Sequence, residues 1–434
     1  MNLPIAKRKL SGWGHYPKAI CSCVRPERYR DLQQLTQLAH PLLARGNGRS
    51  YGDVSFTSRG TTVLMERFDR ILDWDASSGR VIAEAGITFA DLIRIFLPQG
   101  WFPAVTPGHA FVTMGGAVAA NVHGKNHYDQ GSFIDTVDSL HLVKANGQLH
   151  QTSRDRDPER FYACFGGLGL TGIIRDVTLR LHAVETGYLQ TERRRTKNLT
   201  ETFAELEQAS QSWPYAVAWL DGLAPGPKRG RGIVDMARHA CLSELPKPLQ
   251  THRWALPYPQ AQTVPPLPLN AIRRPLMRQY NRLKWYRSPP TTEIKDWHQF
   301  FYPLDALGKW YRLYGPAGFI QYQFSVSGNL GLALIEKIMD ALAQGDCLPT
   351  LMVLKRLRKP AQPTSSLDFL QDGWTVALDF PYSRNLLTIL DTCDHWVVEA
   401  GGRIYLAKDS RWQGQLPVGE SGFGSNGSDR WRLN

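Results

Sequence analysis

The chain has 434 residues, of which 42% are hydrophobic and 21% are charged, and its formal net charge is +12. This composition excludes a disordered or fibrous protein, and the length allows two domains with well-buried cores. The longest nearly uncharged run, at about 111–122, is too short to span a bilayer, and no apolar stretch follows the basic N-terminal residues, so neither a transmembrane helix nor a signal peptide is expected.

A glycine-rich loop, Arg-Gly-Asn-Gly-Arg-Ser-Tyr-Gly-Asp, occupies residues 45–53. Glycines let backbone N–H groups approach an anion closely, and Arg45 and Arg49 add positive charge. The spacing of Gly46, Gly48 and Gly52 matches neither the Rossmann nor the Walker A pattern. The loop therefore indicates phosphate or pyrophosphate binding, with a tight surface turn as the alternative.

Two further stretches of small residues, 106–127 and 165–174, follow before residue 175. In the first, Gly115 and Gly116 precede several alanines, so a flat, bulky ligand can lie against this backbone; a close-packed core segment is the alternative. Polar donors end the stretch, from His123 to His127. Three glycine-rich stretches separated by strand-like segments favour a large cofactor.

Residues 1–184 alternate between expected strands and helices. A strand at 80–85 precedes an amphipathic helix that Thr88 can cap. Asn146-Gly147 predicts a hairpin between two strands. Asp157-Pro158 can open a helix, and 173–182 alternates like a strand.

The second half of the chain changes in composition. Residues 224–290 are rich in Pro, Arg and Lys, with little clear periodicity until 276–287, and the proline-rich segments 245–248 and 263–269 predict long loops. Later segments regain clear patterns. Strands are expected at 318–326, 351–355, 374–380 and 403–407, and helices at 330–343 and 386–399.

The segment 273–287 combines cations with Leu, Met, Trp and Tyr. This mixture suits a membrane surface or a phosphorylated amphiphile. Nucleic acid and a plain solvated face are the alternatives, but no nucleic-acid motif is present and no nucleic-acid partner is expected. The six cysteines are scattered without metal-ligand spacing, so free thiols and no metal site are expected.

Several motifs together resemble the decaprenylphosphoryl-β-D-ribose 2′-oxidase family, within the FAD-dependent oxidoreductases of the vanillyl-alcohol-oxidase type. The resemblance spans about residues 10–411. The motifs that carry it are Ser-Gly-Trp-Gly at 11–14, the loop at 45–53, His-Gly-Lys-Asn-His at 123–127, Gly-Gly-Leu-Gly-Leu-Thr-Gly at 166–172, Gln-Tyr-Gln at 321–323 and Ala-Lys-Asp-Ser-Arg at 407–411.

The resemblance implies an α+β protein: a two-part FAD-binding domain with an inserted substrate domain built on an antiparallel sheet. The FAD-binding domain would span 1–184, the substrate domain 185–401, and a return strand to the FAD domain 402–411. After Arg411 the chain departs from the family pattern: the Gly- and Ser-rich residues 412–434 predict a disordered tail that looks truncated or frame-shifted.

The resemblance also assigns residues to roles. The catalytic residue would be Lys408, which would bind the substrate hydroxyl or act as a base if its pKa is lowered. The substrate-binding residues would be His123, Trp219, Tyr302, Gln321, Gln323 and Lys355. The cofactor-binding residues would be Arg45, Gly46, Asn47, Gly48, Arg49, Ser50, Tyr51, Gly52, Gly108, Thr113, Met114, Gly115, Gly116, His123, Gly124, Lys125, Asn126, Ile174 and Tyr405.

Some of these residues also have ordinary structural explanations. Gln321 and Gln323 share one face of a strand, which could be solvated, while Trp219 and Tyr302 suit core packing. Three positions differ from the pattern: Arg49 replaces the flavin-linking His of related oxidases, Ala377 replaces a cysteine, and Thr375 replaces an Asn. Because arginine cannot form the flavin bond, the FAD is expected to be non-covalent.

The resemblance implies oxidation of the 2′-hydroxyl of a polyprenyl-phosphoryl-β-D-ribose, a cell-wall arabinan precursor. A separate keto-sugar reductase would complete the epimerisation. The expected location is cytoplasmic, with a peripheral place at the inner membrane. The alternatives are an aldonolactone or alditol oxidase acting on a soluble sugar, or an inactive flavoprotein disabled by its altered C-terminus.

Overall fold

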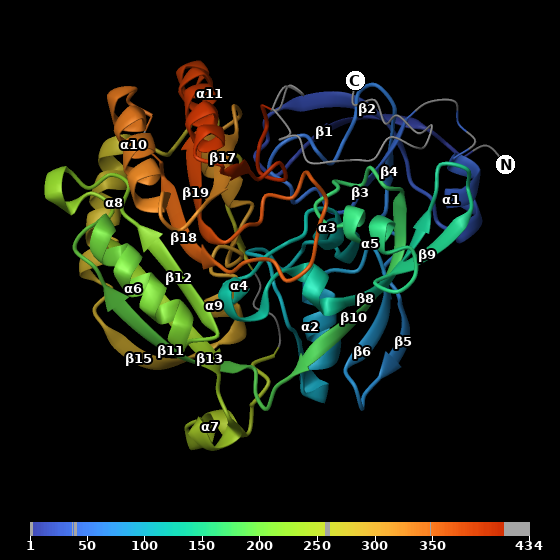
Figure 1. Cartoon of the computed structure of the whole chain (residues 1–434), viewed down its shortest axis with the longest axis horizontal. Coiled ribbons are helices and arrows are strands. Elements are labelled where there is room, and N and C mark those ends of the chain that lie inside the picture. The colour runs from blue at the N-terminus through green and yellow to red at the C-terminus, as the bar shows by residue number, and fades with distance from the viewer. Residues whose placement is uncertain (1–2, 37, 39–40, 257–260, 348, 412–434) are drawn as a thin grey trace.

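The computed structural model describes residues 3–36, 38, 41–256, 261–347 and 349–411. Within them, the chain forms a mixed α+β fold of two halves that lie side by side (Figure 1). Residues up to β10 (Ile173–Ala183) form one half, and the strands from β11 (Tyr188–Arg195) onward form the other. The predicted α+β class is confirmed.

The first half holds two sheets. The smaller has the order β1-β2-β4-β3, and the larger has the order β5-β6-β10-β8-β9, with β7 also pairing with β10. The strands are β1 (Ala6–Ser11), β2 (Lys18–Val24), β3 (Leu42–Arg45), β4 (Thr61–Leu64), β5 (Ile71–Asp75), β6 (Arg80–Glu84), β7 (Trp101–Pro103), β8 (Val137–Val143), β9 (Leu149–Ser153) and β10 (Ile173–Ala183). The helices are α1 (Tyr29–Leu35), α2 (Phe89–Phe96), α3 (Met114–Ala119), α4 (His127–Gln130) and α5 (Pro158–Cys164).

Local signals place several of these elements as expected. Thr88 caps α2, since its hydroxyl accepts the Asp91 N–H at 3.2 Å. Phe89 and Phe96 on the inner face of α2 are buried in the core. The β8–β9 hairpin turns at Gly147, whose φ of 78° is readily adopted by glycine.

The second half is an eight-stranded antiparallel sheet with the order β15-β11-β13-β12-β18-β19-β17-β20. Its strands are β11 (Tyr188–Arg195), β12 (Tyr215–Leu220), β13 (Gly232–His239), β15 (Thr291–Asp296), β17 (Phe319–Val326), β18 (Leu351–Leu357), β19 (Gly373–Pro381) and β20 (Arg403–Ile404). The helices are α6 (Leu199–Ser212), α7 (Lys247–Gln250), α8 (Arg274–Tyr286), α9 (Trp297–Phe301), α10 (Gly331–Gln344) and α11 (Arg384–Glu399). A separate short pair joins β14 (Gln262–Thr263) and β16 (Leu307–Gly308).

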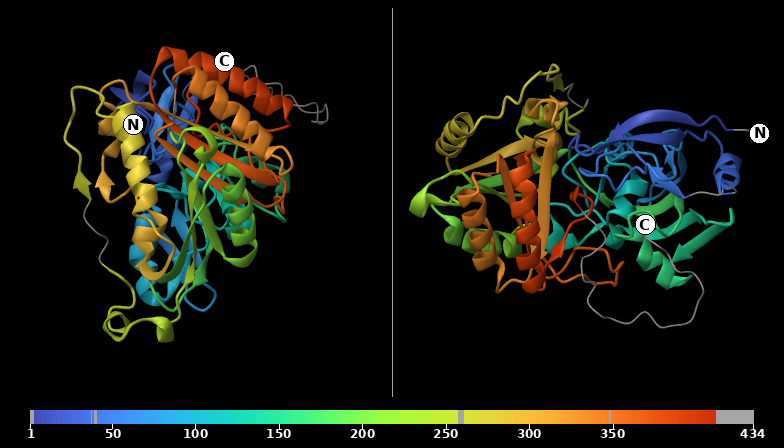
Figure 2. Two further views of the ribbon diagram at one scale, coloured as in Figure 1. Left: turned by 90° about the vertical axis from the view of Figure 1, so that its left-hand side faces the viewer. Right: turned by 90° about the horizontal axis from the view of Figure 1, so that it is seen from above.

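The two faces of this sheet have different partners. Side chains alternate along a strand, so Tyr322 and Phe324 of β17 pack in the apolar core shared with α6, α10 and α11. Gln321 and Gln323 therefore point to the opposite face, toward the first half of the chain. Figure 2 shows these helices on the outer side of the sheet, away from the other half. The inner face of the sheet is thus free to form a wall of a site.

Two sequence expectations needed correction. No strand is expected within 224–275 because the segment has little clear periodicity, but β13 lies between β11 and β12 in the large sheet. Its sequence, Gly-Ile-Val-Asp-Met-Ala-Arg-His, does not alternate regularly between apolar and polar residues, so periodicity does not reveal the strand. The expected strand at 403–407 extends only over Arg403–Ile404 and pairs with β17 of the large sheet.

Among the described residues, no helix has both the length and the apolar character required to cross a bilayer. The predicted C-terminal tail, 412–434, lies outside the described residues.

Candidate active site

A cavity of about 280 Å³ lies between the glycine-rich segments of the first half and the inner face of the large sheet. The glycine-rich segments provide one wall, and β17, β18 and β19 provide the other. Of the residues predicted for the site, the following line it: Gly46, Asn47, Gly48, Arg49, Ser50, Tyr51, Gly108, Thr113, Gly115, Gly116, His123, Ile174, Gln321, Gln323, Lys355, Tyr405 and Lys408.

The glycine-rich loop is held by backbone contacts with two other motifs. Trp13 N–H donates to the Ser50 carbonyl at 2.8 Å, and Tyr51 N–H donates to the Ala407 carbonyl at 3.0 Å. A side chain at Gly52 would overlap the Asp409 carbonyl. The motifs at 11–14, 45–53 and 407–411 thus interlock, which explains why a side chain cannot be accommodated at this glycine.

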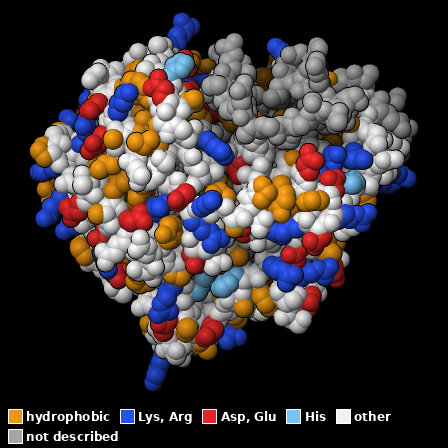
Figure 3. Space-filling model, viewed as in Figure 1, with side chains coloured by type: hydrophobic (Ala, Val, Ile, Leu, Met, Phe, Trp, Pro, Cys, Tyr) orange, Lys and Arg blue, Asp and Glu red, His pale blue; other side chains and the backbone are white. Residues whose placement is uncertain are grey.

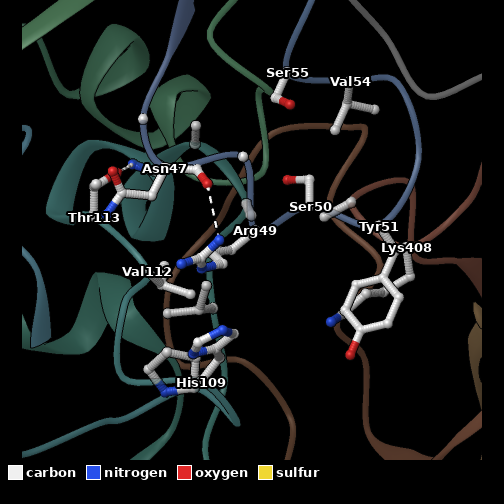
Figure 4. Close-up of a pocket in the computed structure, with 18 of the residues that line it drawn as sticks. Asn47, Arg49, Ser50, Tyr51, Val54, Ser55, His109, Val112, Thr113 and Lys408 are labelled. Carbon is white, nitrogen blue, oxygen red and sulfur yellow. Dashed lines mark hydrogen bonds between the residues drawn. The ribbon is translucent and has the colours of Figure 1, made fainter. Parts of the chain in front are cut away.

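Arg45 and Arg49 of this loop have different surroundings. Arg45 does not line the cavity; its guanidinium donates to Ser55 Oγ and to the Ser11 carbonyl, each at 2.7 Å. Arg49 lines the cavity, lies 4.5 Å from the Trp13 ring centroid and donates to the Asn47 carbonyl at 3.3 Å (Figure 4). Among the described residues, no partner reaches its buried Nε.

The second glycine-rich segment presents a flat backbone to the same cavity. Thr113 caps α3, with its hydroxyl accepting the Gly116 N–H at 3.3 Å. A Cβ at Gly115 would lie 3.0 Å from Ala85 Cβ, while a side chain at Gly46 would overlap Thr113. Because these positions leave no room for a side chain, glycine backbone faces the cavity here. A bulky planar cofactor can lie against such a surface.

These features fit FAD. The loop at 46–51 with the unpaired Arg49 Nε would hold the anionic pyrophosphate, and the backbone at 113–116 would lie against the planar part of the molecule. Neither histidine nor cysteine occupies residue 49, so the loop offers no nucleophile for a flavin bond at that position.

We therefore expect the flavin to be released when the protein is precipitated with acid. Yellow colour in the supernatant, measured by absorbance, would agree with non-covalent binding. Flavin that remains with the protein pellet, or a protein mass increased by that of FAD under denaturing conditions, would contradict it.

A cluster of nitrogen bases lines the sheet side of the cavity. Burial lowers the pKa of Lys408 to about 7, and burial together with the charges of Lys408 and Lys125 lowers the pKa of Lys355 to about 7. Burial also holds the pKa of His123 well below its usual range, so its imidazole is neutral. Both lysines can exchange protons near neutral pH.

The amides of β17 connect this cluster to the sheet. Gln323 Nε2 lies 3.3 Å from His123 Nε2 and donates to Thr375 Oγ1 at 3.1 Å. Thr375 thus accepts the bond from Gln323 at the position where the family pattern has an Asn. Ala377, which replaces a cysteine of the pattern, also lines the cavity and brings no thiol to it.

Asp379 is a functional candidate that sequence reasoning missed. It faces Gln321 across the β17–β19 register and accepts a hydrogen bond from Gln321 Nε2 at 2.5 Å. Burial raises its pKa to about 7, whereas the Lys408 charge opposes that rise. The signal was available in the alternation of β19, since residues 375, 377 and 379 share one face.

A second missed candidate is the His109–Asp305 pair. His109 lines the cavity, and its Nδ1 lies 3.0 Å from Asp305 Oδ2. Burial lowers the His109 pKa despite this carboxylate. No sequence motif joins the two residues, which come from different halves of the chain.

Lys408 lies opposite Arg49 in this cavity. Its Nζ is 3.7 Å from the Tyr51 ring centroid, and Figure 4 shows the Tyr51 and Lys408 side chains next to each other. Arg411, three residues later, anchors the segment through ion pairs with Asp391 and Asp394 of α11, at 2.8 and 3.0 Å. The Ala-Lys-Asp-Ser-Arg motif therefore combines an anchor with a cavity-facing lysine.

The remaining predicted residues do not line the cavity. They are Arg45, Gly52, Met114, Gly124, Lys125, Asn126, Trp219 and Tyr302. Lys125 donates to the Phe300 carbonyl, and Asn126 donates to the Ala104 carbonyl at 2.7 Å. Trp219 packs against the Lys284 ammonium at 4.3 Å, and Tyr302 is fully buried in a core cluster.

Comparisons with known proteins show the family of the chain. Residues 22–153 match the model of an FAD binding domain. The decaprenylphosphoryl-β-D-ribose oxidase of Mycolicibacterium smegmatis is 34% identical over 419 residues, covering 94% of this chain and 90% of that protein. An uncharacterized protein of Streptomyces coelicolor is 34% identical over 76% of this chain and 91% of its own, and L-gulonolactone oxidase of Bos taurus is 27% identical over 44% of each. The chain belongs to the decaprenylphosphoryl-β-D-ribose oxidase family and is an FAD-dependent oxidoreductase acting on CH–OH groups.

Proposed function

We propose that the protein oxidises the 2′-hydroxyl of a polyprenyl-phosphoryl-β-D-ribose to the keto sugar. The observation that carries this proposal is the cavity wall formed by Lys355, Lys408, Gln321 and Gln323. Both lysines can exchange protons near neutral pH, so Lys355 can bind a phosphate as an ammonium and Lys408 can accept a proton as an amine, while the two amides can bind sugar hydroxyls. The similarity to a relative named for this lipid-linked substrate supports the choice.

The proposed roles follow from the geometry. The chemistry that bound FAD supplies is acceptance of the hydride from the carbon bearing the hydroxyl. Lys408 Nζ binds that hydroxyl and, as the neutral amine, takes its proton. Gln321 and Gln323 hold the sugar in one orientation, and Lys355 binds the phosphate as an ammonium. A bound phosphate would raise the pKa of Lys355 and favour this charged form.

The proposal includes a place in a reaction sequence. Oxidation turns the 2′ carbon into a planar carbonyl, so a separate reductase that delivers hydride to the other face would complete an epimerisation. The lipid-linked substrate would also bring the protein to a membrane surface, with a cytoplasmic location at the inner membrane. The substrate-domain role of 185–401 belongs to the same proposal.

Lys355→Met tests the phosphate role. Losing a charge-assisted hydrogen bond should raise KM for a short-chain polyprenyl-phosphoryl-β-D-ribose in detergent by about 10- to 100-fold, with a smaller effect on kcat. The exposed Lys359→Met is the matched control and should leave KM unchanged. An unchanged KM in Lys355→Met, with FAD retained, would remove the phosphate role.

A comparison of substrates distinguishes the proposed function from its main alternative, the soluble-sugar oxidase. Reduction of an artificial electron acceptor should proceed with the phosphoryl-ribose and yield a product two hydrogens lighter. Faster turnover of L-gulonolactone, with rapid reoxidation by O₂, would instead favour the soluble-sugar oxidase. The inactive-flavoprotein alternative, which rests on residues 412–434, predicts no turnover of either compound.

Asp379→Asn tests the proton-acceptor role of Lys408. The Asp379 charge raises the Lys408 pKa, so its removal should lower that pKa further. Activity that needs the neutral amine rises with pH through this pKa. The rise in kcat/KM should therefore move to lower pH by about one unit in the variant. An unchanged midpoint in the pH profile would contradict this role.

A further inference from the structure

Helix α8 buries Asn281 and exposes a row of large apolar side chains. Asn281, buried to 2% exposure, donates to Asp221 Oδ1 at 3.0 Å, and Trp285 Nε1 donates to the Thr196 carbonyl at 3.1 Å. Leu276, Tyr280 and Leu283, by contrast, are 60%, 56% and 45% exposed. Their spacing of four and three residues places them along one side of the helix. In an ordinary surface helix, a row of this kind is buried against the protein.

The apolar surface is concentrated at this place. Among the residues described, five of the fourteen exposed large hydrophobic side chains fall within 18 consecutive residues: Leu269, Leu276, Tyr280, Leu283 and Tyr286. Single exposed apolar residues are normal, but a cluster marks an interaction surface. Helix α8 lies on the outside of the molecule (Figure 2), so the cluster is open to a partner.

The charge along this segment of the chain has one sign. No Asp or Glu occurs between Glu244 and Glu293, a stretch with eight cations: Lys247, Arg253, Arg273, Arg274, Arg278, Arg282, Lys284 and Arg287. Arg274 pairs with Asp346, and Lys284 packs on Trp219, but Arg273, Arg282 and Arg287 are exposed. On the face seen in Figure 3, cations and anions are instead interspersed.

A strip of backbone connects this surface to the active-site cavity. Residues 262–271 run beside 307–313, with Val264 N–H donating to the Gly308 carbonyl at 2.9 Å and Ala271 N–H to the Leu313 carbonyl at 2.8 Å. Leu304, which lines the cavity and is 41% exposed, lies at the near end of this strip. Apolar surface thus occurs at the cavity, along the strip at Leu269 and on α8.

We infer that the outward face of α8 docks on an anionic lipid bilayer, with Leu276, Tyr280 and Leu283 entering the interface and the exposed arginines contacting lipid phosphates. A helix that carries tyrosine and leucine next to arginine is typical of helices that lie at a membrane interface. A cluster of positive charges complements anionic headgroups. The inference builds on the proposed lipid-linked substrate: a polyprenyl chain leaving the cavity past Leu304 would reach the bilayer that α8 contacts.

Vesicle flotation with the FAD-loaded full chain tests the inference. The protein should float with phosphatidylcholine vesicles that contain phosphatidylglycerol and not with phosphatidylcholine alone. A triple variant, Arg273→Gln, Arg282→Gln and Arg287→Gln, should partition about 100-fold less, at roughly fivefold for each cation. A second triple variant, Leu276→Ser, Tyr280→Ser and Leu283→Ser, should also lose flotation.

The exposed strand β1 provides the matched control. Lys7→Gln, Arg8→Gln and Lys9→Gln remove the same charge from another surface and should leave flotation unchanged. Equal loss in this control, or flotation retained in both α8 variants, would overturn the inference. A wild-type protein that does not float would also overturn it. A change of oligomeric state in the serine variant, without a change in flotation, would overturn it too and would indicate a second copy as the occupant.

This experiment is independent of the proposed reaction. All variants should retain FAD and oxidise a short-chain, detergent-solubilised substrate at the wild-type rate, because the altered side chains point away from the cavity. Loss of flotation with normal turnover supports docking by α8. Absence of turnover in the wild type would count against the proposed function and leave the flotation result to be judged separately.

Discussion

Replacing Lys408 by alanine is expected to slow substrate-driven reduction of the bound flavin by about 1,000-fold, while FAD stays in place. The reason is that burial lowers the Lys408 pKa to about 7, so its neutral amine is available in the cavity as a proton acceptor. Stopped-flow absorbance under anaerobic conditions measures the rate directly.

Lys408→Arg distinguishes the contribution of the positive charge at this residue from the contribution of proton transfer. Arginine keeps the positive charge but does not give up its proton, so a slow Arg variant would assign the effect to proton transfer. The exposed Lys359→Ala is the control and should behave like wild type. A Lys408→Ala enzyme that reduces its flavin at the wild-type rate would contradict the role.

Gly52→Ala is expected to abolish FAD binding and to lower the free energy of unfolding by about 3 kcal/mol. The added methyl group would overlap the Asp409 carbonyl, which belongs to backbone and cannot rotate away. The interlock of residues 11–14, 50–52 and 407–409 would have to open, and this would displace both the phosphate loop and Lys408.

Gly328→Ala provides the matched control, because a Cβ at Gly328 meets no atom within 4 Å. It should leave both the thermal transition and the flavin-to-protein absorbance ratio unchanged. Full FAD occupancy in Gly52→Ala, with an unshifted thermal transition, would show that this close approach is not needed.

Local patterns predicted much of the fold. The Thr88 cap, the Asn146-Gly147 hairpin and the alternation of β17 are set by neighbouring residues, so each could be read from a short window. β13 could not be identified in this way, because its sequence, Gly-Ile-Val-Asp-Met-Ala-Arg-His, does not alternate regularly between apolar and polar residues.

The sequence motifs predicted some residues of the candidate site and missed others. The glycine-rich loop, Gln321, Gln323, Lys355 and Lys408 lie together as the motifs indicate. The alternation of β19 could have placed Asp379 on the inner face, but its pairing with Gln321 depends on the sheet register, and the His109–Asp305 pair depends on the contact between the two halves. Motif matching also included residues such as Lys125 and Asn126, whose side chains bind backbone carbonyls beside the cavity.

The most direct test is the anaerobic visible spectrum of the purified protein before and after addition of polyprenyl-phosphoryl-β-D-ribose. The proposed function predicts that the oxidised-flavin band disappears and that the sugar is recovered two hydrogens lighter. A flavin band that persists with this substrate but disappears with a soluble lactone or alditol would contradict the proposed substrate. A band that persists with every sugar would contradict the proposed activity.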